Sequence, residues 1–142
     1  MSEHSTDTVH TDYTVSREDA IAQTVGMVMI RAPKTLPGDA LVGDVRRAFE
    51  RSTMRTVLLA HDGRFVGAIE RDGLPADASD HEAAGRYVES DPLTVTPAMP
   101  MSEAIGLLES RAEPRLIVLD EDGITLRGLL CAKPGGAQFC VR

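Results

Sequence analysis

Hydrophobic and polar positions follow the same order twice along this chain. Each half begins with a short extended segment, residues 33–36 (PKTL) and 92–95 (PLTV), where proline and β-branched residues favour a strand over a helix. Each half later contains a nearly all-apolar run, residues 56–60 (TVLLA) and 116–120 (LIVLD). Runs of this kind predict strands that are buried on both faces.

Between the two strands of each half, apolar residues recur at helical spacing. They are Leu41, Val42, Val45, Ala48 and Phe49 in the first half, and Met101, Ala104, Ile105 and Leu108 in the second. We expect Asp39 to cap the first helix and Pro100 to open the second. A further helix is predicted before each half, over residues 17–29 with Ser16 as N-cap and over residues 81–88 with Ser79 or Asp80 as N-cap.

An Asp-Gly pair follows each apolar run, at residues 62–63 and 122–123. Asp-Gly between two apolar runs is the signal of a tight β-hairpin. We therefore expect residues 65–70 (FVGAIE) and 126–131 (LRGLLC) to return as antiparallel strands.

These landmarks align at a period of 59–61 residues. Pro33 falls on Pro92 and Thr35 on Thr94. With one extra residue before Pro97, Leu41 falls on Met101, Val45 on Ile105, Ala48 on Leu108 and Arg55 on Arg115. One more insertion brings Gly67 onto Gly128. The chain is therefore predicted to be an internal repeat of a helix-strand-helix-strand-strand unit.

The expected organisation is a repeat over residues 16–75, a second repeat over residues 76–134, a flexible N-terminal tail over residues 1–15 and a C-terminal tail over residues 135–142. A half of about 60 residues is only marginally stable alone. We expect the two α/β halves to bury their small sheets against each other around a pseudo-twofold axis.

Composition excludes several classes of function. A net charge of -7 argues against a protein that binds nucleic-acid backbones. No apolar run approaches the roughly 20 residues of a membrane span, and the polar N-terminus has no signal-peptide core, so a cytoplasmic location is expected. The two cysteines are nine positions apart, the four histidines are scattered, and no metal site is expected.

The repeated order resembles a pair of cystathionine-β-synthase-type (CBS) domains, or Bateman module, over about residues 24–134. The resemblance is carried by PKTLP and PLTVTP, by helices beginning near Leu41 or Met101, by Arg55 and Arg115 before the apolar strands, and by the Asp-Gly turns and the glycines of VGAI and RGLL. It implies an α/β fold with two small sheets around a shared cleft. It also implies dimerisation and the sensing of an adenosine-containing ligand.

In the family that the chain resembles, the last strand commonly ends with glycine, two apolar residues, Ser or Thr, two more residues and an Asp that binds ribose. The first half has Glu70 at the hydroxyl position and Gly73 at the Asp position, with Asp72 one residue early. The second half has Cys131 and Pro134 at these positions. The family's proline in the apolar strand is replaced by Val57 and Ile117.

The candidate ligand-binding residues are Thr35, Arg55, Val57, Glu70, Asp72, Thr94, Arg115, Ile117 and Cys131. Each has a simpler alternative. The threonines can bond the local backbone, and the arginines can pair with acids or cover apolar surface instead of binding phosphate. Glu70 and Asp72 can form a solvated charge cluster with Arg71.

The sequence therefore predicts a non-catalytic sensor module, acting as a homodimer, for a ligand of the AMP, ADP, ATP, NAD or S-adenosylmethionine class. No cofactor is expected to be required, and the regulated protein is unknown. The alternative is a ligand-independent dimerisation or docking module that has lost the ribose site. An enzyme is disfavoured because no catalytic triad or phosphate-binding glycine loop can be assembled. A redox sensor built on Cys131 and Cys140 is a minor variant.

Overall fold

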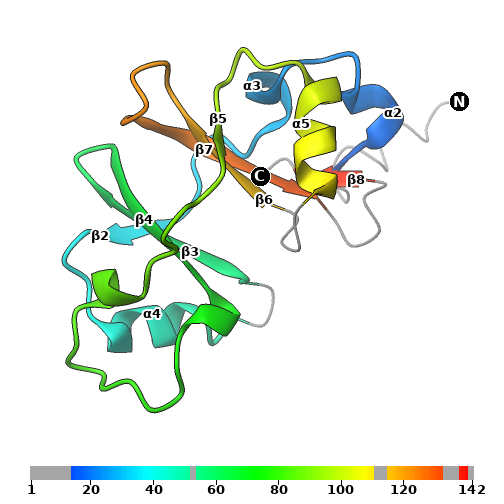
Figure 1. Ribbon diagram of the computed structural model, residues 1–142. Helices are drawn as coiled ribbons and strands as arrows, with labels where there is room; N and C mark the ends of the chain where they lie inside the picture. The colour runs from blue at the N-terminus through cyan, green and yellow to red at the C-terminus, as the bar shows by residue number, and fades with distance from the viewer. Residues whose placement is uncertain (1–13, 52–53, 111–114, 133–137, 141–142) are drawn as a thin grey trace, which may run out of the picture. The chain divides into compact units, whose positions relative to one another are not determined.

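The computed structural model describes residues 14–51, 54–110, 115–132 and 138–140 (Figure 1). It has a mixed α/β architecture with two small sheets, as the sequence predicts. The chain forms two compact units. The five-stranded unit comprises Met1–Ala32, Thr94–Asp120 and Arg127–Arg142, and the three-stranded unit comprises Pro33–Leu93 and Glu121–Leu126.

The five-stranded unit contains a sheet in the order β1-β8-β7-β6-β5 (Figure 1). Its strands are β1 (Thr14–Ser16), β5 (Thr94–Val95), β6 (Arg115–Leu119), β7 (Leu126–Ala132) and β8 (Gln138–Cys140). Its helices are α2 (Arg17–Ala20), α3 (Val25–Val28) and α5 (Met101–Glu109). Strand β5 runs parallel to β6, whereas β8 is antiparallel to both β7 and β1.

Strands β1 and β8 come from the segments that the sequence analysis assigned to the two tails. They pair with each other, and Phe139 of β8 is only 1% exposed. Burial of this large apolar side chain stabilises β8 in its place between β1 and β7. Part of both terminal segments is therefore built into the sheet, which the repeat pattern did not predict.

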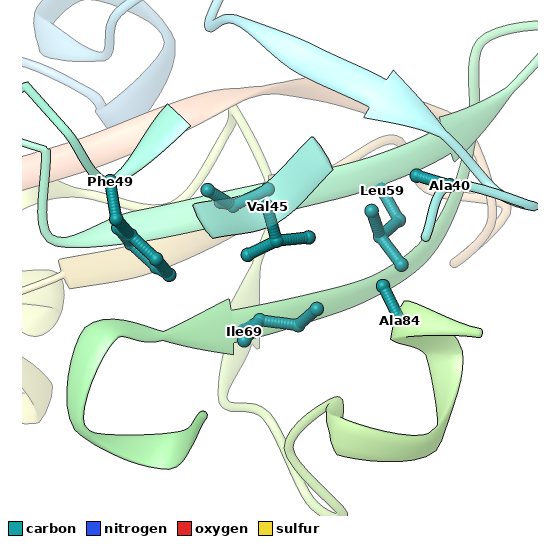
Figure 2. Close-up of a cluster of buried hydrophobic side chains, with 7 residues drawn as sticks. Ala40, Val45, Phe49, Leu59, Ile69 and Ala84 are labelled. Carbon is teal, nitrogen blue, oxygen red and sulfur yellow. The ribbon is translucent and has the colours of Figure 1, made fainter. Parts of the chain in front are cut away.

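The three-stranded unit contains a sheet in the order β2-β3-β4. Its elements are β2 (Thr35–Pro37), α4 (Val42–Ala48), β3 (Thr56–His61), β4 (Arg64–Glu70) and two 3₁₀ helices, η1 (Arg71–Gly73) and η2 (Ala84–Tyr87). The core of the unit lies between α4 and one face of β3 and β4 (Figure 2). It consists of Ala40, Val45, Phe49, Val57, Leu59, Ile69 and Ala84.

The two central helices and the first hairpin form where they are predicted, whereas the second Asp-Gly pair lies in a longer connection between Leu119 of β6 and Leu126 of β7 and not in a tight hairpin. Met101, Ala104, Ile105 and Leu108 are all buried, and so are Val42, Val45 and Phe49 of the first half. Gly63 and Gly123 both adopt a positive φ, at 78° and 72°. Glycine adopts this conformation without the steric cost that a Cβ atom brings, which explains the glycine in each turn.

The helices that precede each half differ from the prediction. Ser16 is the N-cap of α2, and its hydroxyl accepts from the amide of Asp19, but the helical stretch breaks into α2 and α3. The stretch over residues 81–88 forms only the 3₁₀ helix η2, and the Ser79 hydroxyl accepts from the amide of His81 before it. Each segment is short, and besides its own turn bonds it donates to a neighbouring segment, as the amides of Val25 and Ala84 do to the carbonyls of Met99 and Ala40.

The N-cap of α4 was also predicted wrongly. The cap residue is Leu41, not Asp39, and the carboxylate of Asp44 in the first turn accepts from the Leu41 amide at 3.0 Å. Pro100 is likewise the N-cap of α5 rather than its first helical residue. A carboxylate at the third helical position can accept from the amide of the N-cap residue, which is half of a capping box.

Equivalent backbone bonds recur in the two units at a constant offset of 59 residues. Within the five-stranded unit the amide of Val25 donates to Met99, and within the three-stranded unit the amide of Ala84 donates to Ala40. The amides of Met101 and Val42 donate to Gln23 and Glu82 in the same way. The helical segment that precedes the strands of each half in the sequence therefore does not pack on those strands. It packs in the unit that holds the strands of the other half.

The constant offset corrects the sequence alignment. Leu41 is the counterpart of Pro100, since both cap a helix, and not of Met101. Thr35 lies opposite Leu58 in one sheet, and Thr94 lies opposite Ile117 in the other. The extra residue therefore falls after the apolar strands, before the second Asp-Gly turn, rather than before Pro97.

Candidate functional site

Candidate residues of the first half gather at one end of the three-stranded sheet. Thr35 opens β2, Arg55 directly precedes β3, and Glu70 ends β4. Because β2 runs parallel to β3 and β4 runs antiparallel to it, these three positions meet at the same end of the sheet. Asp72 follows in η1. Thr35, Arg55 and Asp72 are exposed, and Glu70 is half-buried.

Val57 is not brought to this group. Its side chain is 3% exposed and belongs to the core under α4, opposite Ile69 in the sheet register. Thr56 and Glu70 are paired one position further along, and Thr35 is paired with Leu58. Side chains alternate between the faces of a strand, so Val57 lies on the opposite face from these residues.

Val57 was chosen as a candidate because the sequence alignment of the two apolar strands was shifted by one residue. With Ile117 as the counterpart of Leu58, the first-half residue on the Thr35 face is Leu58, which is 1% exposed. By the same offset the counterpart of Arg115 is Thr56 and not Arg55. The sequence could have identified Leu58 if the 59-residue offset between Thr35 and Thr94 had been kept as far as the apolar strands, where it pairs Leu58 with Ile117.

The carboxylate of Glu70 is held by Thr56. The Thr56 hydroxyl donates to Oε2 of Glu70 at 2.8 Å, across the pair that opens β3 and closes β4. Thr56 is a buried polar residue, 8% exposed. A hydrogen bond from a buried hydroxyl to a charged acceptor fixes the carboxylate at the sheet end. Sequence reasoning missed Thr56.

Arg71 also stabilises this end of the three-stranded sheet. Its guanidinium donates to the carbonyls of Met54 and Arg51, at 2.6 and 2.8 Å from Nη2, and lies 5.0 Å from the centroid of the Phe49 ring. Its amide donates to the carbonyl of Arg55. Arg71 is therefore not part of a solvated charge cluster, as one interpretation of the sequence had it. It ties the turn after β4 to the segment before β3.

The candidates of the second half meet at the corresponding end of the five-stranded sheet. Thr94 lies opposite Ile117, Arg115 opens β6, and Cys131 is the next-to-last residue of β7. Thr94 is exposed, Arg115 and Cys131 are half-buried, and Ile117 is 5% exposed. Cys131 occupies the strand position that Glu70 has in the other unit, so this end of β7 offers a thiol where β4 offers a carboxylate.

Two other kinds of site were sought in the described part of the chain. Its His, Cys, Asp and Glu residues form no group of three or more that could hold a metal ion. Its helices are all too short or too polar to cross a membrane.

The model of the CBS domain family matches residues 84–133. A search of curated proteins found no match to the chain.

Solved structures show a similar fold over about three quarters of the chain. A cystathionine beta-synthase pair domain from Shewanella oneidensis MR-1 is 19% identical with a TM-score of 0.68, covering 77% of this chain and 65% of that one. CBSX2 from Arabidopsis thaliana, in complex with AMP, is 22% identical with a TM-score of 0.67, covering 77% and 90%. The cytosolic domain of the Mg²⁺ channel MgtE, in complex with ATP, is 19% identical with a TM-score of 0.66, covering 77% and 46%.

At these identities the structural matches show the fold alone, and the family model matches the sequence of residues 84–133. Residues 84–133 match the CBS domain family, and about three quarters of the chain has the fold of tandem CBS domain pairs.

Proposed function

We propose that this chain is a non-catalytic regulatory module that binds an adenosine-type ligand at the Thr35–Glu70 end of the three-stranded sheet. The observation that carries the proposal is the Glu70 carboxylate, which Thr56 holds at 2.8 Å. A ribose diol needs a carboxylate acceptor, as the acidic residue of dinucleotide-binding folds illustrates. Glu70 supplies one at the position where the family pattern has a hydroxyl.

The neighbouring groups suit the rest of such a ligand. Strand β2 lies at an edge of its sheet, so one side of its backbone is not used by the ladder to β3 and can bond an adenine base. The exposed Arg55 side chain, next to Thr56, can bind a phosphate. Two structures with this fold, CBSX2 and the MgtE cytosolic domain, were solved with AMP and with ATP.

The five-stranded unit offers a poorer site by the same chemistry. Its strand end presents Cys131 instead of a carboxylate, and the predicted partner position, Pro134, lies outside the described residues. A thiol is a weak acceptor for a ribose hydroxyl. We therefore place the ligand in the three-stranded unit and expect at most one site of appreciable strength per chain.

The second candidate is a ligand-independent docking or dimerisation module. The placement of Cys131 favours it, because one of the two strand ends has lost the polar group that a sugar needs. Under this alternative the chain uses its fold only to join a regulated protein whose identity the sequence does not reveal.

Homodimerisation and a cytoplasmic location belong to the same proposal. The apolar residues of α4 and α5 are mostly buried within the chain itself, so they are not available to a second copy. Ile21 and Met27 of the five-stranded unit remain 48% and 61% exposed, however, and apolar exposure of this kind supports association. A monomer in sedimentation at high micromolar concentration would contradict a dimer.

The test of ligand binding is a thermal-shift screen of AMP, ADP, ATP, NAD and S-adenosylmethionine, followed by calorimetry on any hit. A ligand that binds only the native state raises the unfolding midpoint. We expect Glu70→Gln to weaken binding by about ten- to a hundredfold, the cost of one hydrogen bond to a charged acceptor.

The matched control is Glu103→Gln, the same chemical change at an exposed residue of α5 in the other unit. It should leave the affinity unchanged. The absence of binding by every adenosine compound would favour the docking module instead.

A further inference from the structure

The chain contains three Asp-Gly dipeptides, at residues 62–63, 72–73 and 122–123, and it contains no asparagine. Asp-Gly is the dipeptide in which aspartate most readily rearranges to isoaspartate, because glycine has no side chain to keep its amide nitrogen away from the carboxyl group. The three dipeptides are chemically equivalent in the sequence. The structure holds each of them in a different way.

The carboxylate of Asp122 is bound by its own turn. Its Oδ1 accepts from the amides of Ile124 and Thr125, and its Oδ2 accepts from the Thr125 hydroxyl at 2.6 Å. These bonds oppose the rotation that would turn the carboxyl carbon toward the amide of Gly123. The Thr125 hydroxyl and then the two amides also lower the pKa of the carboxyl from 3.8 to about 2. Above pH 4 the protonated fraction of Asp122, the form that reacts, therefore falls by more than about tenfold.

Asp72 and Gly73 lie in a helical turn. They are the last two residues of the 3₁₀ helix η1, Arg71–Gly73. In a 3₁₀ helix an amide donates to the carbonyl three residues before it. Because Gly73 closes the helix, its amide lies within the turn and not at the open N-terminal end. An amide nitrogen in this position is directed away from the side chain of the preceding residue.

Asp62 lies in a more open turn. Asp62 and Gly63 are the two residues between β3 and β4, with φ of 51° and 78°. His61 and Arg64 form the register pair that closes the turn, so the amide of Gly63 lies outside the ladder. The Asp62 side chain is 87% exposed. It lies 3.5 Å from Nε2 of the exposed His61, and an ion pair of this kind restrains a side chain little.

We propose that Asp62 is a site of spontaneous modification, at which the folded chain converts aspartate to isoaspartate while Asp72 and Asp122 are protected. The amide nitrogen of Gly63 attacks Cγ of the protonated carboxyl group. The new C–N bond closes a cyclic succinimide, and the carboxyl hydroxyl group leaves with the amide proton as water. Water then opens the ring. Opening at Cγ restores aspartate, and opening at the main-chain carbonyl carbon gives isoaspartate, with no net change in mass.

The contacts of this turn determine what the modification does to the fold. Isoaspartate adds a methylene group to the main chain of a turn whose two residues set the register of β3 against β4. The Gly63 carbonyl also accepts from the Leu126 amide, and the Phe65 amide donates to the Ile124 carbonyl. The modification should therefore loosen this end of the hairpin and lower the midpoint of thermal unfolding of the aged protein.

The inference does not depend on the proposed adenosine site. That site lies at the opposite end of the same sheet, where β3 begins and β4 ends. Loss of ligand binding and formation of isoaspartate are therefore separate observations.

The experiment ages the full chain in native buffer and, separately, in urea at the same pH and temperature, and then maps its tryptic peptides. Each dipeptide falls in a peptide of its own, residues 56–64, 72–86 and 116–127, and fragmentation that distinguishes isoaspartate from aspartate locates the product. In urea we expect similar rates at the three dipeptides. In the folded chain Asp62 should isomerise faster than Asp72 and Asp122 by about tenfold or more, because the other two sites must first open locally.

Asp62→Asn, Asp72→Asn and Asp122→Asn are matched variants that remove the carboxyl proton from the comparison, since an amide side chain closes the same ring by releasing ammonia. In the folded variants, isoaspartate should form fastest at position 62. If a variant fails to fold, the peptide map of the unaltered chain still decides the question. Equal rates at the three sites of the folded chain, a faster rate at Asp72 or Asp122, or no isoaspartate at Asp62 would each overturn the proposal.

Discussion

A Cβ atom placed on Gly67 would lie 2.5 Å from Cγ1 of Val88. Gly67 lies in β4, and Val88 packs against the core of the same unit. The residues that follow them, Ala68 and Glu89, are hydrogen-bonded, because the amide of Glu89 donates to the carbonyl of Ala68 at 2.8 Å. The glycine shared by VGAI and RGLL is therefore a site of close backbone approach. At Gly128 the same role is seen, where a Cβ would meet the carbonyl of Ile30 and the side chain of Met29.

Gly67→Ala should lower the free energy of unfolding by about 1–3 kcal/mol, because the added methyl group overpacks a contact with the body of Val88. Urea denaturation measures the change. Gly85→Ala is the matched control, since nothing lies within 4 Å of a Cβ at that position. An equal loss in both variants would show that the contact with Val88 is not the cause.

Gly106→Ala should have the opposite sign. Gly106 is exposed in the interior of α5, and a Cβ atom added there would meet no atom within 4 Å. Alanine restricts the unfolded chain and has the higher helix propensity, so the free energy of unfolding should rise by about 0.5–1 kcal/mol. Thermal unfolding followed by circular dichroism would show a higher midpoint, and an unchanged or lower one would contradict the placement of this glycine.

Arg71→Lys should destabilise the chain by about 1–3 kcal/mol even though the charge is retained. Lysine cannot reproduce the fork that reaches the carbonyls of Met54 and Arg51 or the stacking on Phe49. Arg47→Lys is the control, because Arg47 makes only an exposed pair with Asp44 on α4. Its cost in denaturant unfolding should be about 0.5 kcal/mol or less.

Asp122 should contribute to the acid dependence of stability. Hydrogen bonds from the Thr125 hydroxyl, the Thr125 amide and the Ile124 amide lower the pKa of its carboxyl from 3.8 to about 2. Because the folded-state pKa is depressed, the stabilisation is fully present above pH 3.8 and is lost as the pH falls toward 2.

Asp122→Asn should therefore lower the midpoint of thermal unfolding at neutral pH and make it fall less steeply between pH 4 and 2. Melting curves across this range measure both effects. A curve parallel to that of the unaltered chain would show that Asp122 does not supply this part of the acid dependence.

The two strand ends should differ as ligand sites. In calorimetry with any adenosine compound that binds, we expect one site per chain, and the double substitution Glu70→Ala with Asp72→Ala should abolish or weaken it by one to two decades, roughly 1.5–3 kcal/mol. Cys131→Ser should leave that affinity unchanged. Two equal tight sites, or binding indifferent to the double substitution, would falsify the assignment to the three-stranded unit.

The sequence by itself determined the elements whose signals are local. The apolar runs at 56–60 and 116–120 lie in buried strands, both Asp-Gly pairs lie in connections between strands with positive φ at glycine, and the apolar faces of α4 and α5 are buried. These features depend on residue conformation and on periodicity within one element, and both are visible in the order of residues. The repeat, and with it the resemblance to a CBS pair, follows from their recurrence.

The tertiary structure decided which residues share a face and which segments share a unit. Strand register moved the counterpart of Ile117 from Val57 to Leu58, because a shift of one residue transfers a side chain to the other face of a sheet. It also paired Thr56 with Glu70 and Cys131 with Cys140, contacts between strands that are joined through backbone hydrogen bonds. Those bonds are made by groups common to every residue, so the sequence carries little record of which partner each strand will choose.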